Sequence, residues 1–181
     1  MKRVLKELLS TGLYLLIVLI FTYLMITYVV QRTVVDGGSM ESTLQDEDQL
    51  LVDKISYRFK EPERFDIIVF PYKYAEDTRY IKRIIGMPGE TIRIGEDGTI
   101  YIDSGSGEVE LKESYGRQII KDPGRAKEPI TLGPDEYFVM GDNRNASSDS
   151  REFDVGNIKR GDIIGKAWVR IWPFEGFGTL D

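Results

Sequence analysis

The sequence predicts a mainly β protein, in which a single N-terminal transmembrane helix precedes an all-β, barrel-like domain. Three observations support this prediction. Residues 8–30 carry no charged side chain, short runs rich in Val, Ile, Phe and Tyr follow them, and turn sequences separate these runs. In addition, no long helical period occurs beyond residue 35, which argues against alternating helices and a parallel sheet.

Residues 8–30 are expected to form the membrane span. As a helix they would be about 34 Å long, enough to cross a hydrocarbon core of about 30 Å. A buried core helix of this length would normally show a polar face. A cleavable signal peptide is the stronger alternative, but the apolar run is long for one, and residues 27–32 offer no small-residue cleavage site. We therefore expect an uncleaved anchor.

The flanking charges predict the orientation of this anchor. Three cations within residues 1–7 precede the span, whereas Arg32 is the lone cation directly after it. Positively charged flanks stay in the cytoplasm. We therefore expect a single-pass protein of the plasma membrane, with residues 1–7 in the cytoplasm and residues 31–181 forming a domain outside it.

Seven strands are expected in the outer domain, bounded by turn signals such as Pro88-Gly89 and Asp97-Gly98. Residues 104–130 contain several Gly and Pro residues and are expected to form an irregular excursion. Trp168, in the last strand, is expected to lie in the core. The expected strands are 49–55, 66–71, 80–85, 91–94, 99–103, 136–141 and 163–171.

Composition restricts the chemistry. The chain has 24 Lys and Arg against 30 Asp and Glu, and because nucleic-acid binding needs a basic surface, nucleic acid is not an expected partner. It contains no His and no Cys, which excludes His-containing triads, cysteine nucleophiles, disulfides and conventional zinc, haem or iron–sulfur sites. We expect no metal and no cofactor. A catalytic base must be a Lys, a carboxylate or a Tyr.

The first candidate segment is residues 36–44, just after the span. Gly37 and Gly38 allow the backbone ahead of Ser39 to approach another chain closely and leave the hydroxyl accessible. The ordinary alternative is a flexible linker that ends in a helix cap at Ser39 or Ser42.

The second segment is the strand around Lys82. Because side chains alternate along a strand, Tyr80, Lys82 and Ile84 are expected on one face and Arg83 on the other. Among apolar neighbours the charged form of Lys82 would lose solvation, which would lower its pKa and produce a general base. An edge strand with solvated charges is the ordinary alternative.

The third segment, residues 141–151, is dense in hydrogen-bonding side chains directly after an apolar strand. A calcium loop is one interpretation, but Arg144 would place a cation among the ligands and no bidentate Glu follows. A turn rich in Asn and Asp is the other.

Taken together and in this order behind one anchor, the three segments resemble those of the type I signal peptidases, in the single-span form typical of Gram-positive bacteria. The resemblance extends over the whole chain and is weakest at residues 104–130. It implies a membrane-anchored serine endopeptidase that cleaves N-terminal signal peptides from exported preproteins at the outer membrane face. Signal peptides and the lipid bilayer are the expected partners.

By the same resemblance, Ser39 is the nucleophile and Lys82 the base of a Ser–Lys dyad that forms an acyl-enzyme. Ser147 is expected to orient the lysine. Asp149 is expected to maintain the site by pairing with Arg151 or Arg83, and Asp142 is the other possible partner of Arg83.

The resemblance also implies shallow apolar walls that accept small side chains before the cut. Two positions depart from the family pattern. Ser42 replaces a usual proline after the nucleophile, and Gly37 stands where some relatives have an oxyanion-donating serine, so a second oxyanion donor is not identified. The expected wall residues are Val35, Met40, Leu44, Leu50, Val69, Tyr80 and Ile81.

Two other functions compete with this one. LexA-like repressor domains share the dyad and a related β fold, but the anchor and the lack of a DNA-binding domain argue against them. A catalytically inactive anchored domain that only binds exported chains is the second, and the intact set of Ser39, Lys82, Ser147 and Asp149 argues against it.

Overall fold

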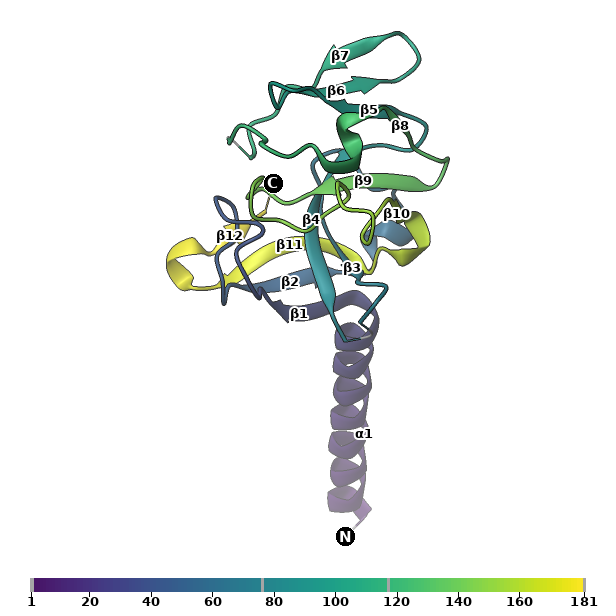
Figure 1. Ribbon diagram of the computed structural model, residues 1–181. Coiled ribbons are helices and arrows are strands. Elements are labelled where there is room, and N and C mark those ends of the chain that lie inside the picture. The colour runs from purple at the N-terminus through teal and green to yellow at the C-terminus, as the bar shows by residue number, and fades with distance from the viewer. Residues whose placement is uncertain (1, 76, 117, 181) are drawn as a thin grey trace.

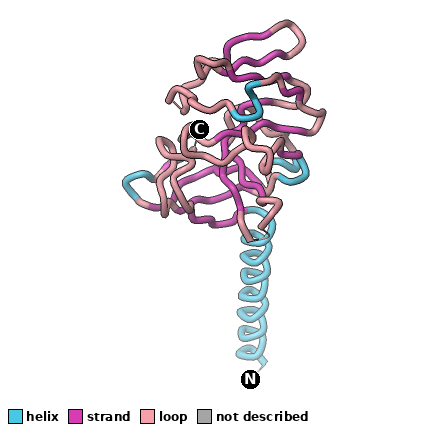
Figure 2. Tube along the Cα trace, in the orientation of Figure 1, coloured by secondary structure: helices cyan, strands magenta, loops and turns pink. Residues whose placement is uncertain are grey.

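A computed structural model describes residues 2–75, 77–116 and 118–180. One N-terminal helix projects from a domain built of two antiparallel sheets (Figures 1 and 2). The large sheet lies next to the helix, and the small sheet lies at the opposite end of the domain. The mainly β class expected from the sequence is confirmed.

Helix α1 (Lys2–Leu24) continues into a π-helical turn (Met25–Val29). Within the described residues, one helix, Arg3–Val29, has the length and apolar composition needed to cross a membrane. None of the side chains in its apolar window is buried within the protein, so its surface favours a non-aqueous environment. Strand β1 begins at Val30, and the β-domain therefore starts directly where the apolar helix ends.

The large sheet has the strand order β1-β2-β11-β3-β4-β9-β10, with β12 paired to β11. All of these pairings are antiparallel. The C-terminal strand β11 thus separates β2 from β3, and β4 lies between β3 and β9. The strands are β1 (Val30–Val34), β2 (Gln49–Asp53), β3 (Ile67–Pro71), β4 (Arg79–Gly86), β9 (Glu136–Met140), β10 (Ile158–Lys159), β11 (Gly165–Trp172) and β12 (Gly178–Thr179).

The small sheet has the order β7-β6-β5-β8. Residues 104–130 are more regular than expected, because they contain β7, a 3₁₀ helix and the first residue of β8. All three residues of β7 are exposed, so this edge strand carries no alternation that the sequence could reveal. The strands are β5 (Thr91–Ile94), β6 (Ile100–Asp103), β7 (Glu108–Glu110) and β8 (Ile130–Thr131), and the 3₁₀ helices of the chain are Ser56–Arg58, Gly124–Lys127, Arg160–Asp162 and Phe174–Gly176.

All seven expected strands are present, with ends within two residues of those expected. The expectation that Trp168 lies in the core is wrong, because 47% of its side chain is exposed. The pairing of β11 with β2 shifts register between Ala167 and Val169. Gly165 and Ala167 are buried, so the ordinary alternation of side chains along β11 places Trp168 on the opposite, outer face.

The core surrounds β4. Buried apolar side chains form three clusters, and the strand supplies Ile81 to one, Ile84 to another and Ile85 to the third. Residues 81–86 are all buried. Two charged side chains, Lys82 and Arg83, are therefore carried into the interior by their apolar neighbours.

Candidate functional site

Ser39 and Lys82 meet at the edge of the core. The Nζ atom of Lys82 lies 2.8 Å from Oγ of Ser39 and donates a hydrogen bond of 3.0 Å to the carbonyl of Ile81. Lys82 is only 3% exposed, and Ser39 is half-buried. Strand β4 presents the lysine and the turn after β1 presents the serine, so two residues singled out separately in the sequence are in hydrogen-bonding contact.

The surroundings of Lys82 increase the fraction of its amine that is neutral. Burial lowers the pKa of its amine from 10.5 to about 8, an effect that the nearby Asp149 and Asp142 carboxylates partly oppose. The ring of Tyr80 lies 4.9 Å from Nζ. With this pKa, roughly a tenth of the amine is neutral at pH 7, about 300 times the fraction expected for an ordinary lysine. Such an amine can accept a hydroxyl proton.

The turn that carries Ser39 is held by backbone contacts. Gly37 has a φ of +89°, a conformation that favours glycine, and its N–H donates to Oδ1 of Asp46 at 2.8 Å. The N–H of Glu41 donates to the Gly38 carbonyl at 3.1 Å. Within the described residues, the N–H of Ser39 has no hydrogen-bond partner, and it can therefore donate to a bound substrate.

Ser42 occupies a conformation that proline cannot adopt. Its φ is +85°, whereas the proline ring holds φ near −65°. The proline expected at this position would therefore not fit the backbone found here. A serine in this left-handed region is mildly strained.

A cavity of about 550 Å³ opens beside Ser39 and Lys82. Four of the seven residues expected to form its apolar walls line it: Val35, Met40, Tyr80 and Ile81. The other three belong to the buried core cluster and do not line the cavity: Leu44, Leu50 and Val69. The cavity is thus a cleft between β1, the serine turn and the start of β4.

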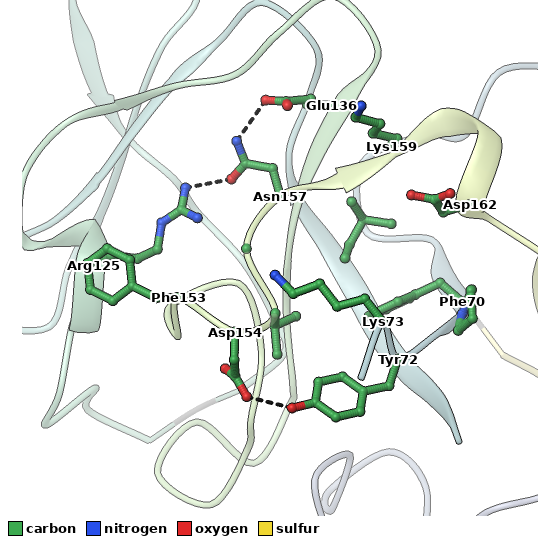
Figure 3. Close-up of a pocket in the computed structure, with 14 residues that line it drawn as sticks. Phe70, Tyr72, Lys73, Arg125, Glu136, Phe153, Asp154, Asn157, Lys159 and Asp162 are labelled. Carbon is green, nitrogen blue, oxygen red and sulfur yellow. Dashed lines mark hydrogen bonds between the residues drawn. The ribbon is translucent and has the colours of Figure 1, made fainter. Parts of the chain in front are cut away.

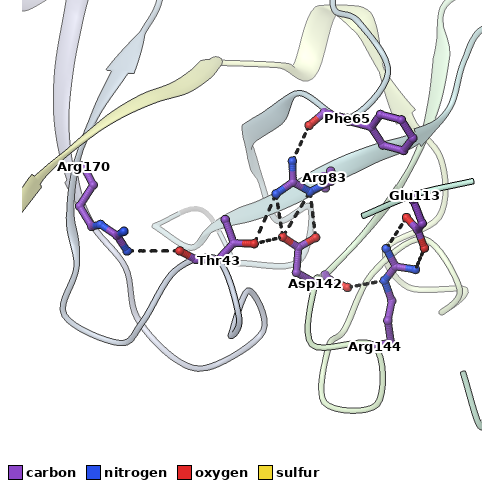
Figure 4. A network of polar contacts seen from close by, with 8 residues as sticks. Thr43, Phe65, Arg83, Glu113, Asp142, Arg144 and Arg170 are labelled. Atoms are coloured by element: carbon purple, nitrogen blue, oxygen red, sulfur yellow. Dashed lines mark hydrogen bonds and ion pairs between the residues drawn. The ribbon is translucent and has the colours of Figure 1, made fainter. Parts of the chain in front are cut away.

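Arg83 pairs with Asp142 (Figure 4). Its Nε donates to Oδ1 at 2.9 Å and its Nη2 to Oδ2 at 2.8 Å, and neither side chain is exposed. Oδ2 also accepts a hydrogen bond of 2.5 Å from the Thr43 hydroxyl. This buried pair therefore ties β4 to the turn that carries Ser39, and it identifies Asp142 as the partner of Arg83.

Asp149 pairs with Arg151. The arginine Nε donates to Oδ1 at 2.8 Å and its Nη2 to Oδ2 at 2.9 Å. Oδ2 also accepts from the N–H of Gly141 at 3.0 Å. Of the two partners left open for Asp149, the structure thus selects Arg151, and the pair closes the 141–151 loop on itself.

Ser147 has no hydrogen bond at its buried Oγ within the described residues. Its expected contact with Lys82 is not formed, since the lysine amine contacts Ser39 and the Ile81 carbonyl. Ser147 nevertheless lies close to the site, because its Oγ and the Ser39 carbonyl oxygen flank the same side of Gly141. An orienting role for Ser147 stays a prediction.

Asn143 is a site residue that the sequence analysis did not assign. Its N–H donates to the Ser39 carbonyl at 3.0 Å, and its Nδ2 donates to the Gly38 carbonyl and to Oε2 of Glu41, each at 3.0 Å. One residue thus holds three groups of the serine turn. The sequence showed only its place in a polar loop.

The excursion also supports the site. Nη2 of the buried Arg144 donates to Oε2 of Glu113 at 2.7 Å, and the ring of Tyr115 lies 3.5 Å from Cζ of Arg83. Both contacts come from the part of the chain where the family resemblance is weakest. Residues 113–115 therefore brace the polar loop and the Arg83–Asp142 pair.

We expect Gly141→Ala to reduce kcat/KM about 100-fold. A Cβ at this position would lie closer than 3.0 Å to both the Ser39 carbonyl and the Ser147 hydroxyl, and an active-site displacement of about 1 Å can cost this much. Gly161→Ala is the matched control, because a Cβ there has no atom within 4 Å. Steady-state kinetics and thermal melting of both variants measure the effect. Equal kcat/KM for the two variants would refute the expectation.

A second cavity, of about 450 Å³, shares no lining residue with the first (Figure 3). The hydroxyl of Tyr72 donates to Asp154 there at 2.8 Å, and Arg125 donates to Asn157 at 2.8 Å. Its charges are balanced, with three cations (Lys73, Arg125 and Lys159) and three carboxylates (Glu136, Asp154 and Asp162). It contains neither Ser39 nor Lys82 and is not the candidate active site.

Metal ligands do not gather anywhere in the described part of the chain. No group of three or more His, Cys, Asp or Glu side chains there could hold a metal ion.

Comparison with known proteins supports one family. A family model described as signal peptidase, peptidase S26, matches residues 8–172. A probable signal peptidase I-2 of Synechocystis is 38% identical over 159 residues, covering 85% of this chain and 68% of that protein. A signal peptidase I of Bacillus caldolyticus is 37% identical, covering 83% and 84%. A crystal structure of a signal peptidase I from Enterococcus faecalis is 35% identical, with a TM-score of 0.47, and covers 59% of this chain and 97% of the other.

Proposed function

The chain belongs to the signal peptidase family, peptidase S26, and we propose that it acts as a membrane-anchored serine endopeptidase through Ser39 and Lys82. Its substrates are the N-terminal signal peptides of exported preproteins. The observation that carries this proposal is the 2.8 Å contact between the Ser39 hydroxyl and a lysine amine whose pKa burial lowers to about 8.

In the proposed reaction, the neutral Lys82 amine takes the hydroxyl proton of Ser39 while Oγ forms a bond to the scissile carbonyl carbon. The carbonyl oxygen becomes an oxyanion, and the unpaired N–H of Ser39 donates to it. When this intermediate collapses, the carbon–nitrogen bond breaks. The Lys82 ammonium then gives its proton to the leaving amine, which is the new N-terminus of the mature protein.

Deacylation uses the same lysine to move a proton from water to the serine. Lys82, neutral again, takes a proton from a water molecule whose oxygen attacks the acyl carbon. The bond to Ser39 Oγ breaks, and the lysine returns the proton to the serine. We assign Asn143, Thr43 and the Arg83–Asp142 pair to positioning of the serine turn, and Ser147 to the third hydrogen-bonding position of the lysine amine.

The proposed arrangement in the membrane follows from the helix and its flanking charges. Arg3–Val29 would cross the plasma membrane once, with the cationic N-terminus in the cytoplasm. The β-domain would then rest on the outer surface, where the signal peptide of an exported preprotein emerges. Val35, Met40, Tyr80 and Ile81 would accept the small side chains before the cut.

The decisive test is Ser39→Ala. Full-length wild-type protein in detergent should cleave a synthetic signal peptide with an Ala-x-Ala site, and the variant should show no detectable cleavage, because the nucleophile is absent. Ser106→Ala, at an exposed position in the turn between β6 and β7, should retain wild-type activity. Full activity of Ser39→Ala would refute the dyad, and binding without cleavage by the wild type would favour an inactive binding domain.

A further inference from the structure

A third cavity lies at the junction between the helix and the β-domain. It has a volume of about 340 Å³, and three of its eight lining residues are cations: Lys54, Arg58 and Arg160. None of the eight is a carboxylate, although residues 36–181 contain 29 Asp and Glu against 20 Lys and Arg. The other lining residues are Thr27, Tyr28, Tyr57, Ile163 and Ile164.

Lys54 joins the cavity to the end of the helix. Its Nζ donates to the Thr27 carbonyl at 2.9 Å, and its N–H donates to the Val29 carbonyl at 2.9 Å. Arg58 is exposed. In the part of the chain that the structure describes, neither cation has an ion-pair partner. Two positive charges at this junction therefore lack a counter-charge from the protein.

Arg160 is partly engaged. Its Nε donates to Glu61 Oε2 at 2.8 Å, and this glutamate side chain is 79% exposed and outside the cavity lining. Nη2 of Arg160 donates to the Tyr57 carbonyl, and Cζ lies 5.5 Å from the Tyr57 ring. These contacts orient the guanidinium beside the two unpaired cations.

The position of the cavity indicates which anion would pair with its cations. Thr27 and Tyr28 are near the C-terminal end of the apolar helix, which in a membrane coincides with the level of the lipid headgroups. Phe59, between Arg58 and Lys60, is 82% exposed, and an exposed aromatic ring among cations is typical of interfacial segments. At this level the abundant anion is the phosphate of membrane lipids.

We propose that this cavity binds the phosphate headgroup of an anionic phospholipid. The guanidinium of Arg58 supplies paired donors for phosphate oxygens, and Arg160 and the Lys54 ammonium add positive charge beside it. Lipid bound here would fix the height of the β-domain, and hence of Ser39, above the membrane. The inference rests on the membrane anchor of the proposed function and is independent of the Ser–Lys chemistry.

The test uses full-length protein in detergent, titrated with phosphatidylglycerol and followed by native mass spectrometry. Wild type should bind one lipid molecule preferentially, and phosphatidylcholine should bind at least tenfold more weakly. Arg58→Gln should weaken phosphatidylglycerol binding about fivefold, and Lys54→Gln combined with Arg58→Gln about 30-fold. Because the Arg58 side chain is exposed and has no hydrogen bond or ion pair within the described residues, its substitution should leave the thermal melting temperature unchanged.

The control removes two exposed cations that do not line this cavity, Lys121→Gln with Lys127→Gln, and should bind lipid like wild type. Equal binding of the two lipids, equal binding by wild type and Arg58→Gln, or displacement of the lipid by millimolar inorganic phosphate would overturn the proposal. Alkali-resistant flotation with vesicles tests the anchor separately, and peptide cleavage by the same preparations tests the dyad.

Discussion

Lys82→Arg should abolish signal-peptide cleavage even though it preserves the positive charge. The guanidinium stays protonated at every accessible pH, so it cannot accept the Ser39 proton. General-base catalysis contributes about 10²- to 10⁴-fold, and we expect kcat/KM to fall by about 10³-fold or more. Lys82→Ala should fall by a comparable factor, since the base is lost in both. Steady-state cleavage of a synthetic signal peptide measures the effect.

The pH profile of the wild type provides the second part of this test. Because burial lowers the pKa of Lys82 to about 8, the neutral amine becomes more abundant as pH rises. The value of kcat/KM should therefore increase about tenfold per pH unit below this pKa and level off above it.

Lys73→Arg, at an exposed position, is the matched control and should keep both activity and profile. Near-normal activity of Lys82→Arg, or a wild-type rate that is flat between pH 6 and about 9, would require a different base.

Asp142→Asn should cause the largest loss of stability. The substitution keeps the shape of the side chain but leaves the guanidinium of Arg83 buried without its carboxylate, and both side chains are fully buried. Breaking one partner of a buried pair costs about 3–5 kcal/mol, which for a chain of this size lowers Tm by about 10 °C. Thermal melting of full-length protein in detergent measures this change.

Glu108→Gln is the control for this prediction. It removes the carboxylate from a surface pair, in which Nη2 of Arg93 lies 2.7 Å from Glu108 Oε2 and the carboxylate is 42% exposed. Exposed pairs contribute at most about 1 kcal/mol, so Tm should change little. If the two variants melted at the same temperature, the Arg83–Asp142 pair would not be a major stabilising element of the fold.

The sequence predicted a large part of the candidate site because composition and local pattern restrict it strongly. With no His and no Cys in the chain, Lys82 was among few possible bases, and alternation along β4 predicted its apolar surroundings. The nucleophile segment was recognisable from its glycines and from its similarity to a known family. The ion pairs of the site were not predictable in this way. Two arginines and two aspartates (Arg83, Arg151, Asp142 and Asp149) allow more than one set of pairs, and only the interatomic distances in the structure show which pairs form.

Other features depended on contacts between distant segments. Asn143 reaches Gly38, Ser39 and Glu41 across more than 100 positions of sequence, and no local pattern encodes such a contact. Tyr115 and Glu113 belong to a stretch that looked irregular, yet they pack against Arg83 and Arg144.

By itself, the sequence determined the apolar helix, the mainly β domain and the positions of its seven principal strands. These follow from residue type and short-range periodicity, which act within a few positions of the chain. The tertiary structure decided which charges pair, that Trp168 lies on the outer face of β11, and that Lys54 and Arg58 meet Arg160 at the end of the helix in a cavity with no carboxylate in its lining. Such features arise only when strands far apart in sequence become neighbours in one sheet, because register and burial are properties of the assembled sheet.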